Sequence, residues 1–262
     1  MFSFISPRIA LLCPALLLVC LACGPAFAHF GMIIPSRTMI KTDAEKTINL
    51  DLLFWHPFEN QGMNLAKPKS FSLFSNGTRS DLLSSLKPAK QGGFDVWKAA
   101  YRAERPGLLA FVMEPQPYWA QEEGRFIVHI TKSYVAAFGE VEGWDKPLGL
   151  PAEIVPLCAP YGLYAGNVFQ GQVLVDGKPA PGAQVEVEFY PGPGKKGQAP
   201  GDLMVTQTVK ADPNGIFTYA APKAGWWGFA ALSTAGYTLP KDGKQCPVEL
   251  GAILWVRFYD MK

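Results

Sequence analysis

The sequence predicts an all-β protein, built as two β-sandwich domains in tandem after a cleaved signal peptide. Two observations predict this class. Short stretches in which apolar and polar residues alternate recur along the chain, which is typical of half-buried strands. The 262 residues also include 26 glycines and 23 prolines, which separate these stretches and leave little room for long helices.

Strand signals are found in both halves of the chain. In the first half, alternation predicts strands over 47–52, 107–112 and 125–130. In the second half, it predicts strands over 168–175, 183–190, 203–209, 216–220, 228–232 and 252–259. Turn sequences such as Asp176-Gly177 and Pro213-Asn214-Gly215 separate them. Short helical turns are expected only within 81–86 and 133–138.

A boundary between the two domains is predicted near residue 146. The segment 143–151 contains two prolines and shows no alternation of apolar and polar residues. We therefore expect an N-terminal β domain over 29–146 and a C-terminal β-sandwich over 147–262.

The N-terminus has the pattern of a secretory signal peptide. Arg8 is the only charge before the apolar run 9–23, and Ala26-Phe27-Ala28 forms a cleavage site of small residues. Residues 1–28 are the predicted signal peptide, so the mature protein is expected to be periplasmic or secreted and to begin at His29. Attachment of lipid at Cys23 is the alternative, and it would remove the free amine of His29.

Two cysteines, Cys158 and Cys246, follow the predicted cleavage site. In an exported protein such a pair predicts one disulfide bond. The alternative is a pair of free, buried thiols.

The charge pattern and the absence of a serine nucleophile motif argue against several classes of function. The formal net charge is +2, with no basic block and no basic patch among aromatic residues, so neither nucleic acid nor an anionic membrane is an expected partner. Ser70, Ser84 and Ser85 lie in no recognisable nucleophile motif. We therefore predict that the protein is not an enzyme.

The three histidines His29, His56 and His129 all fall in the first predicted domain. As a first residue, His29 offers its α-amine and its imidazole, a pair that suits Ni²⁺, Co²⁺ or Cu²⁺. We predict a metal site from these three histidines, with Glu59 as an oxygen ligand.

Each candidate ligand has an ordinary structural alternative. His56, just before Pro57, is otherwise a loop histidine bonded to backbone, and Glu59 a surface acid. His129 is otherwise a packed strand histidine, on the face opposite Val128 and Ile130.

An ordered set of short motifs resembles a known family. The motifs are His29-Phe30, Trp55-His56-Pro57-Phe58, Glu153-Ile154-Val155-Pro156-Leu157, Gly177-Lys178-Pro179, Asp212 with Gly215, and Gly225-Trp226-Trp227. The chain resembles a bacterial family of exported proteins of unassigned domain function, described as the periplasmic component of nickel or cobalt uptake systems. The second half also resembles transthyretin-like and carboxypeptidase-regulatory sandwich modules. The resemblance implies a bound nickel or cobalt ion, membrane transporter subunits as partners, and His56 as a site residue.

Together these observations predict an exported transition-metal-binding protein that serves nickel or cobalt uptake. A periplasmic copper chaperone that uses the same nitrogen ligands is one alternative. A structural or adhesive β module without metal is the other. The sequence chooses neither the metal nor the oligomeric state.

Overall fold

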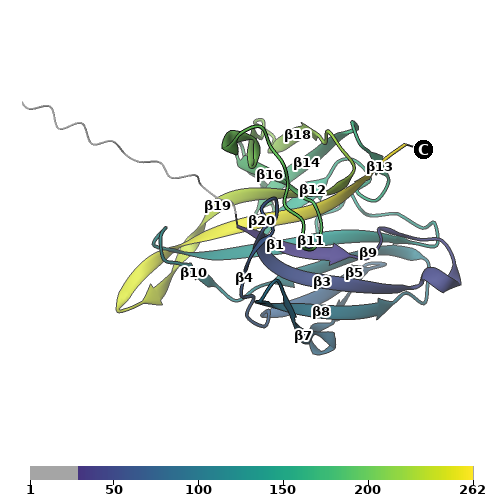
Figure 1. Cartoon of the computed structure of the whole chain (residues 1–262), viewed down its shortest axis with the longest axis horizontal. Helices are drawn as coiled ribbons and strands as arrows, with labels where there is room; N and C mark the ends of the chain where they lie inside the picture. The colour runs from purple at the N-terminus through teal and green to yellow at the C-terminus, as the bar shows by residue number, and fades with distance from the viewer. Residues whose placement is uncertain (1–28, 262) are drawn as a thin grey trace, which may run out of the picture.

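The computed structural model describes residues 29–261, and it confirms an all-β fold (Figure 1). The predicted signal peptide and Cys23 lie outside the described residues. Three short 3₁₀ turns accompany the strands: η1 (Asp43–Glu45), η2 (Leu83–Ser85) and η3 (Asp202–Met204). No helix in the described part is both long and apolar enough to cross a membrane.

The strands form three sheets. The N-terminal sheet has the order β1 (Phe30–Pro35), β3 (Thr47–His56), β8 (Phe94–Arg102) and β7 (Lys87–Gln91), and β4 (Gln61–Met63) also pairs with β3. The C-terminal sheet contains β12 (Ala152–Pro156), β14 (Val168–Val175) and β15 (Lys178–Pro179), and β18 (Ile216–Ala220) pairs with β14.

The third, central sheet has eleven strands. Its order is β17 (Gln207–Lys210), β16 (Gln184–Tyr190), β19 (Gly225–Lys241), β20 (Lys244–Tyr259), β11 (Arg125–Ala137), β9 (Gly107–Glu114), β5 (Ser70–Ser75) and β6 (Thr78–Asp81). Two short strands, β10 (Tyr118–Ala120) and β2 (Met39–Ile40), pair with β11, and β13 (Leu163–Tyr164) pairs with β20.

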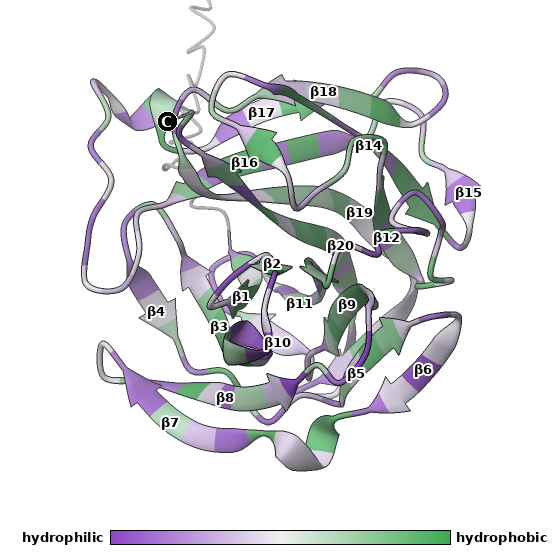
Figure 2. Cartoon of the chain, turned by 90° about the vertical axis from the view of Figure 1, so that its right-hand side faces the viewer, coloured by the Kyte–Doolittle hydropathy of each residue, from purple (hydrophilic) through white to green (hydrophobic). Residues whose placement is uncertain are grey.

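The central sheet contains strands from both sides of residue 146. Its two halves meet where β11 runs parallel to β20, from Phe126 opposite Val248 to Ser133 opposite Trp255. The N-terminal and C-terminal sheets cover its opposite faces, so the layers form sandwiches with a shared middle sheet (Figure 2). The division into units at residue 146 stays a prediction.

Alternation along β11 divides its side chains between two hydrophobic cores. Val128 and Ile130 pack with residues of the C-terminal sheet, whereas Ile127 and Val135 pack with residues of the N-terminal sheet. His129 is buried on the second face, as the alternation predicts.

Two local predictions are wrong and one is confirmed. Residues 133–137 belong to β11 rather than to a helical turn, because they pair with β9 and are buried. The strand predicted over 203–209 begins only at Gln207, since residues 202–204 form η3. The helical turn predicted within 81–86 is confirmed as η2.

The predicted disulfide is also wrong: Cys158 and Cys246 are free thiols. Cys246 lies near the start of β20. Cys158 contacts Val168, and the adjoining Gly162–Asn167 region reaches the far end of the same strand through Ala165 and Tyr259. A strand of 16 residues is about 50 Å long, far beyond the reach of one disulfide.

Thiol labelling of the unfolded, unreduced protein that begins at His29 is therefore expected to give two adducts per chain. The measurement is the intact mass after reaction with iodoacetamide in denaturant. The reduced protein is the control, and it should give the same mass. A mass without adducts would show that the two cysteines are joined after all.

Candidate metal centre

The pairing of β1 with β3 brings two of the predicted ligands together. Phe30 lies opposite Trp55 in this antiparallel pair, so the preceding residue, His29, falls opposite His56. The two imidazole ring centroids are 4.6 Å apart. His29 and His56 are therefore neighbours because of strand register, although 26 residues separate them in the chain.

Aromatic side chains surround His29. Its ring stacks on Phe54 at a centroid distance of 5.6 Å, and Tyr118 lies 6.0 Å away. Burial, together with the nearby His56 and His129, lowers the pKa of His29 to about 4, against the opposing charge of Glu249. The imidazole of His29 is therefore neutral at neutral pH, with a lone pair available for a metal.

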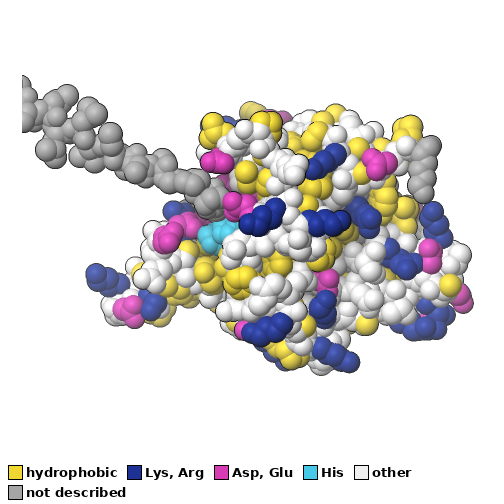
Figure 3. Space-filling model, in the orientation of Figure 1, with side chains coloured by type: hydrophobic (Ala, Val, Ile, Leu, Met, Phe, Trp, Pro, Cys, Tyr) yellow, Lys and Arg dark blue, Asp and Glu magenta, His cyan; other side chains and the backbone are white. Residues whose placement is uncertain are grey.

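Four carboxylates, of Glu122, Glu123, Glu186 and Glu249, join this pair in an open cleft of about 770 Å³. The Oε1 atom of Glu123 is 3.7 Å from Nδ1 of His29, while Glu249 and Glu186 also line the cleft. Figure 3 shows acidic side chains beside the exposed histidine surface. Burial raises the pKa of Glu186 to about 7, and the charges of Glu249 and Glu123 add to this effect.

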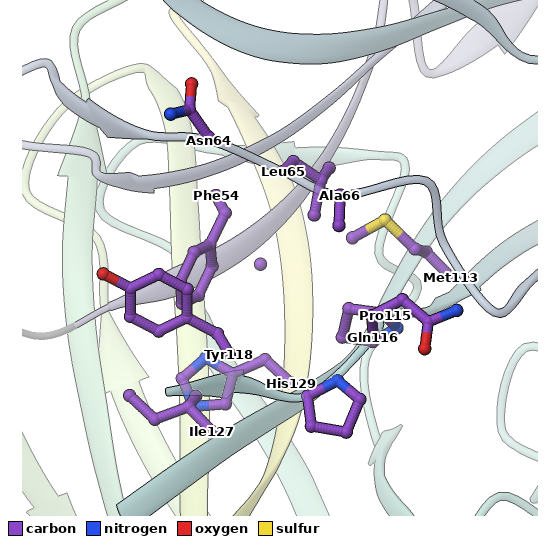
Figure 4. A pocket seen from close by; sticks show the side chains of 12 residues that line it. Phe54, Asn64, Leu65, Ala66, Met113, Pro115, Gln116, Tyr118, Ile127 and His129 are labelled. Atoms are coloured by element: carbon purple, nitrogen blue, oxygen red, sulfur yellow. The ribbon is translucent and has the colours of Figure 1, made fainter. Parts of the chain in front are cut away.

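His129 lies in the wall behind the pair rather than in the cleft. Its side chain is 1% exposed, and its Nε2 is 3.1 Å from Oε1 of Glu249. The ring borders a separate, mostly apolar pocket below Phe54 and beside Tyr118 and Ile127 (Figure 4). Hydrogen bonding to His129 and the charges of His129 and Arg125 outweigh burial and keep the pKa of Glu249 below its usual value.

Glu59 does not line the cleft. Its charge instead acts on Glu188, whose carboxylate accepts hydrogen bonds from the Phe58 amide and the Thr206 hydroxyl. Sequence reasoning missed all four cleft glutamates: Glu122, Glu123, Glu186 and Glu249. Glu249 did carry a signal, since it interrupts the apolar residues of a buried strand.

Glu188, on β16, thus holds the loop after His56 through the hydrogen bond from the Phe58 amide. The free energy of unfolding is expected to depend on pH through this group. Burial raises the pKa of Glu188 from 4.5 to about 8, so the folded protein keeps a proton that the unfolded chain releases. The free energy of unfolding should therefore fall as pH rises from about 5 to about 8.

Glu188→Gln is expected to reduce the fall in the free energy of unfolding between pH 5 and pH 8 by at least about 1 kcal/mol. Urea denaturation at several pH values measures it. The matched control is Glu140→Gln at an exposed position, which should leave the slope unchanged. Parallel pH profiles for the parent and Glu188→Gln would contradict the prediction.

The side chains of the described residues supply too few converging donors for a metal ion, so at least one more donor is needed. Among residues 29–261, no three His, Cys, Asp or Glu side chains converge closely enough to hold a metal ion. His29 and His56 offer two imidazoles, both ligands that suit nickel, cobalt and copper. The α-amine of His29, if cleavage frees it, is a third nitrogen on the same residue.

The fold and the cleft define an all-β protein of layered sheets with a histidine- and glutamate-lined cleft at the end of β1 and β3. Residues 26–235 match the sequence profile of the family described as "Domain of unknown function (DUF4198)", and the chain belongs to that family. No curated protein matches the sequence.

Several solved structures are similar to this chain at low identity. The D0–D1 domain of intimin is 12% identical with a TM-score of 0.25, and the match covers 88% of this chain and 100% of that one. A chimeric titin Z1Z2-Z1Z2 tandem is 10% identical with a TM-score of 0.20, covering 85% and 99%. The Yersinia pseudotuberculosis adhesin InvE is 12% identical with a TM-score of 0.23, covering 85% and 58%. At TM-scores this low, these likenesses carry no argument about fold or function.

Proposed function

We propose that this chain is an exported binding protein for a divalent transition metal, nickel or cobalt, and that it serves a membrane uptake system. The observation that carries the proposal is the pairing of His29 with His56 across β1 and β3, at a ring distance of 4.6 Å. The sequence places a cleavage site directly before one member of this pair.

The chemistry of the cleft favours a borderline cation. Burial keeps the His29 imidazole neutral, and a metal needs that unprotonated form. The amine and imidazole of His29 would chelate the ion, and His56 would add a third nitrogen. Glu123 and Glu249 give the cleft a negative field that attracts cations.

His129 acts in this proposal as a positioning residue. Its hydrogen bond holds the carboxylate of Glu249 at the cleft. Delivery to membrane transporter subunits requires no chemical turnover, so no catalytic residue is needed. Nitrogen ligands also bind Cu²⁺ more tightly than Ni²⁺ or Co²⁺, which makes copper handling the second candidate.

Calorimetric titration of the protein that begins at His29 tests the proposal. We expect one Ni²⁺ or Co²⁺ per chain. His56→Ala should weaken binding by at least about 100-fold because a ligand is lost. His129→Ala should weaken it by a smaller factor, because His129 acts only through the charge of Glu249. Unchanged affinity in His56→Ala would contradict the site. The metal content of protein purified from cells supplied with all three metals tests the copper function. Protein that carries mainly copper would favour it.

A further inference from the structure

Arg125 lies between two of the four carboxylates that line the cleft, Glu123 and Glu249. Its Nε is 3.3 Å from Oε2 of Glu123, and its Nη1 is 3.3 Å from Oε2 of Glu249. One guanidinium therefore spans both acids with two different nitrogen atoms. Arginine is suited to this because its donors are held in a fixed planar fork.

The second oxygen of each carboxylate faces a histidine. Oε1 of Glu123 is 3.7 Å from Nδ1 of His29, and Oε1 of Glu249 is 3.1 Å from Nε2 of His129. Both acids therefore have Arg125 on one oxygen and an imidazole on the other. Glu249 is only 13% exposed, whereas Arg125 is 43% exposed, so solvent partly screens this pair.

This arrangement affects nitrogen-preferring and oxygen-preferring cations differently. Ca²⁺, Mg²⁺ and Mn²⁺ bind through carboxylate, carbonyl and water oxygens. Of the cleft's four carboxylates, Glu123 and Glu249 are the two that lie against both a histidine ring and Arg125. Nickel, cobalt and copper bind well to imidazole and amine nitrogens, which Arg125 does not occupy. The guanidinium thus competes with one class of cation for its ligands and leaves the ligands of the other class open.

We propose that Arg125 is a specificity-determining residue of the cleft, which occupies the carboxylates of Glu123 and Glu249 and thereby excludes cations that prefer oxygen ligands. The inference rests on the proposed function, because it concerns the selectivity of the same metal centre. It predicts that the two acids shape the field of the cleft but become available as metal ligands only when Arg125 is removed.

Arg125→Gln tests the proposal, with Mn²⁺ as the probe of oxygen-preferring cations. Electron paramagnetic resonance measures free Mn²⁺, and calorimetry measures Ni²⁺, both on protein that begins at His29. The parent is expected to bind Mn²⁺ negligibly at 1 mM, whereas Arg125→Gln should gain at least about tenfold in Mn²⁺ affinity. Its Ni²⁺ affinity should rise by a smaller factor.

Two further variants separate ligand release from simple loss of charge. Arg125→Lys keeps the positive charge but cannot span both acids, so it should gain part of the Mn²⁺ binding. Glu249→Gln added to Arg125→Gln should remove the gain. A cooperative thermal unfolding transition, measured for each variant, is the control that the variant is folded.

Each outcome decides the proposal. A Mn²⁺ gain that exceeds the Ni²⁺ gain and requires Glu249 supports it. Equal gains for both ions would mean that Arg125 acts only through its charge, and no Mn²⁺ gain would mean that it does not guard the carboxylates; either overturns the proposal. A parent that fails to bind Ni²⁺ contradicts the proposed function, while the Mn²⁺ comparison still decides the role of Arg125.

Discussion

One glycine added in front of His29 is expected to weaken Ni²⁺ binding by at least about 100-fold, or about 2.7 kcal/mol. The added residue converts the α-amine of His29 into an amide, whose nitrogen lone pair is delocalised into the carbonyl and donates only after the amide loses its proton. No three side chains of the described residues hold a metal without that amine. The loss should therefore be as large as the loss of a side-chain ligand.

Two comparisons separate the amine from the imidazole. His29→Ala keeps a free amine in the same place and loses the ring, so it should also bind weakly. A glycine added at the C-terminus is the matched control and should bind like the parent. Calorimetric titration of all four proteins measures the effect. Equal Ni²⁺ affinity in the extended protein and the parent would show that the amine is not a ligand.

The pH dependence follows from the same donors. Burial holds the pKa of His29 near 4, so protons do not compete with the metal for its ring nitrogen near neutral pH. An α-amine ordinarily titrates at about 8. Ni²⁺ affinity should therefore fall by about tenfold per pH unit between pH 8 and 6, as protons take the amine. A flat profile over this range would indicate that other groups bind the metal.

The largest expected effect on stability comes from the buried ion pair of Lys132 and Glu153. Nζ of Lys132 is 2.6 Å from Oε1 of Glu153, and both side chains are at most 2% exposed. The backbone amide of Leu148 also donates to this carboxylate at 2.9 Å. Glu153→Gln leaves the ammonium of Lys132 buried without a counter-charge, and should cost about 3–5 kcal/mol.

A solvent-exposed pair provides the control. Asp51 and Lys98 are 2.9 Å apart with side chains 32% and 48% exposed, so Asp51→Asn should cost less than about 1 kcal/mol. Urea denaturation at pH 7 measures both variants. If Glu153→Gln cost no more than Asp51→Asn, the buried pair would contribute nothing beyond an ordinary surface contact.

Local patterns in the sequence were sufficient for the strands but not for their partners. Alternation located β9, β14 and β18 closely because each strand's own residues determine which side chains are buried. Register between strands depends on contacts across the chain. The meeting of His29 with His56 therefore could not be derived from sequence, although both residues were singled out.

The same limit explains the residues that were missed and the disulfide that was wrong. Glu249 reaches His129 only because β20 pairs with β11, across 120 residues of chain. Cys158 and Cys246 were predicted to pair because they are the two cysteines after the cleavage site. The number of cysteines says nothing about the distance between them.

The parallel contact of β11 with β20 sets the order in which this molecule can fold. The first half of the central sheet has no neighbour for β11 on that side until residues 244–259 are available. Closing so long a loop is slow, because its entropy is lost before the contacts that reward it form. The cleft, which Glu249 helps to line, is therefore completed only when residues 244–259 have paired with β11.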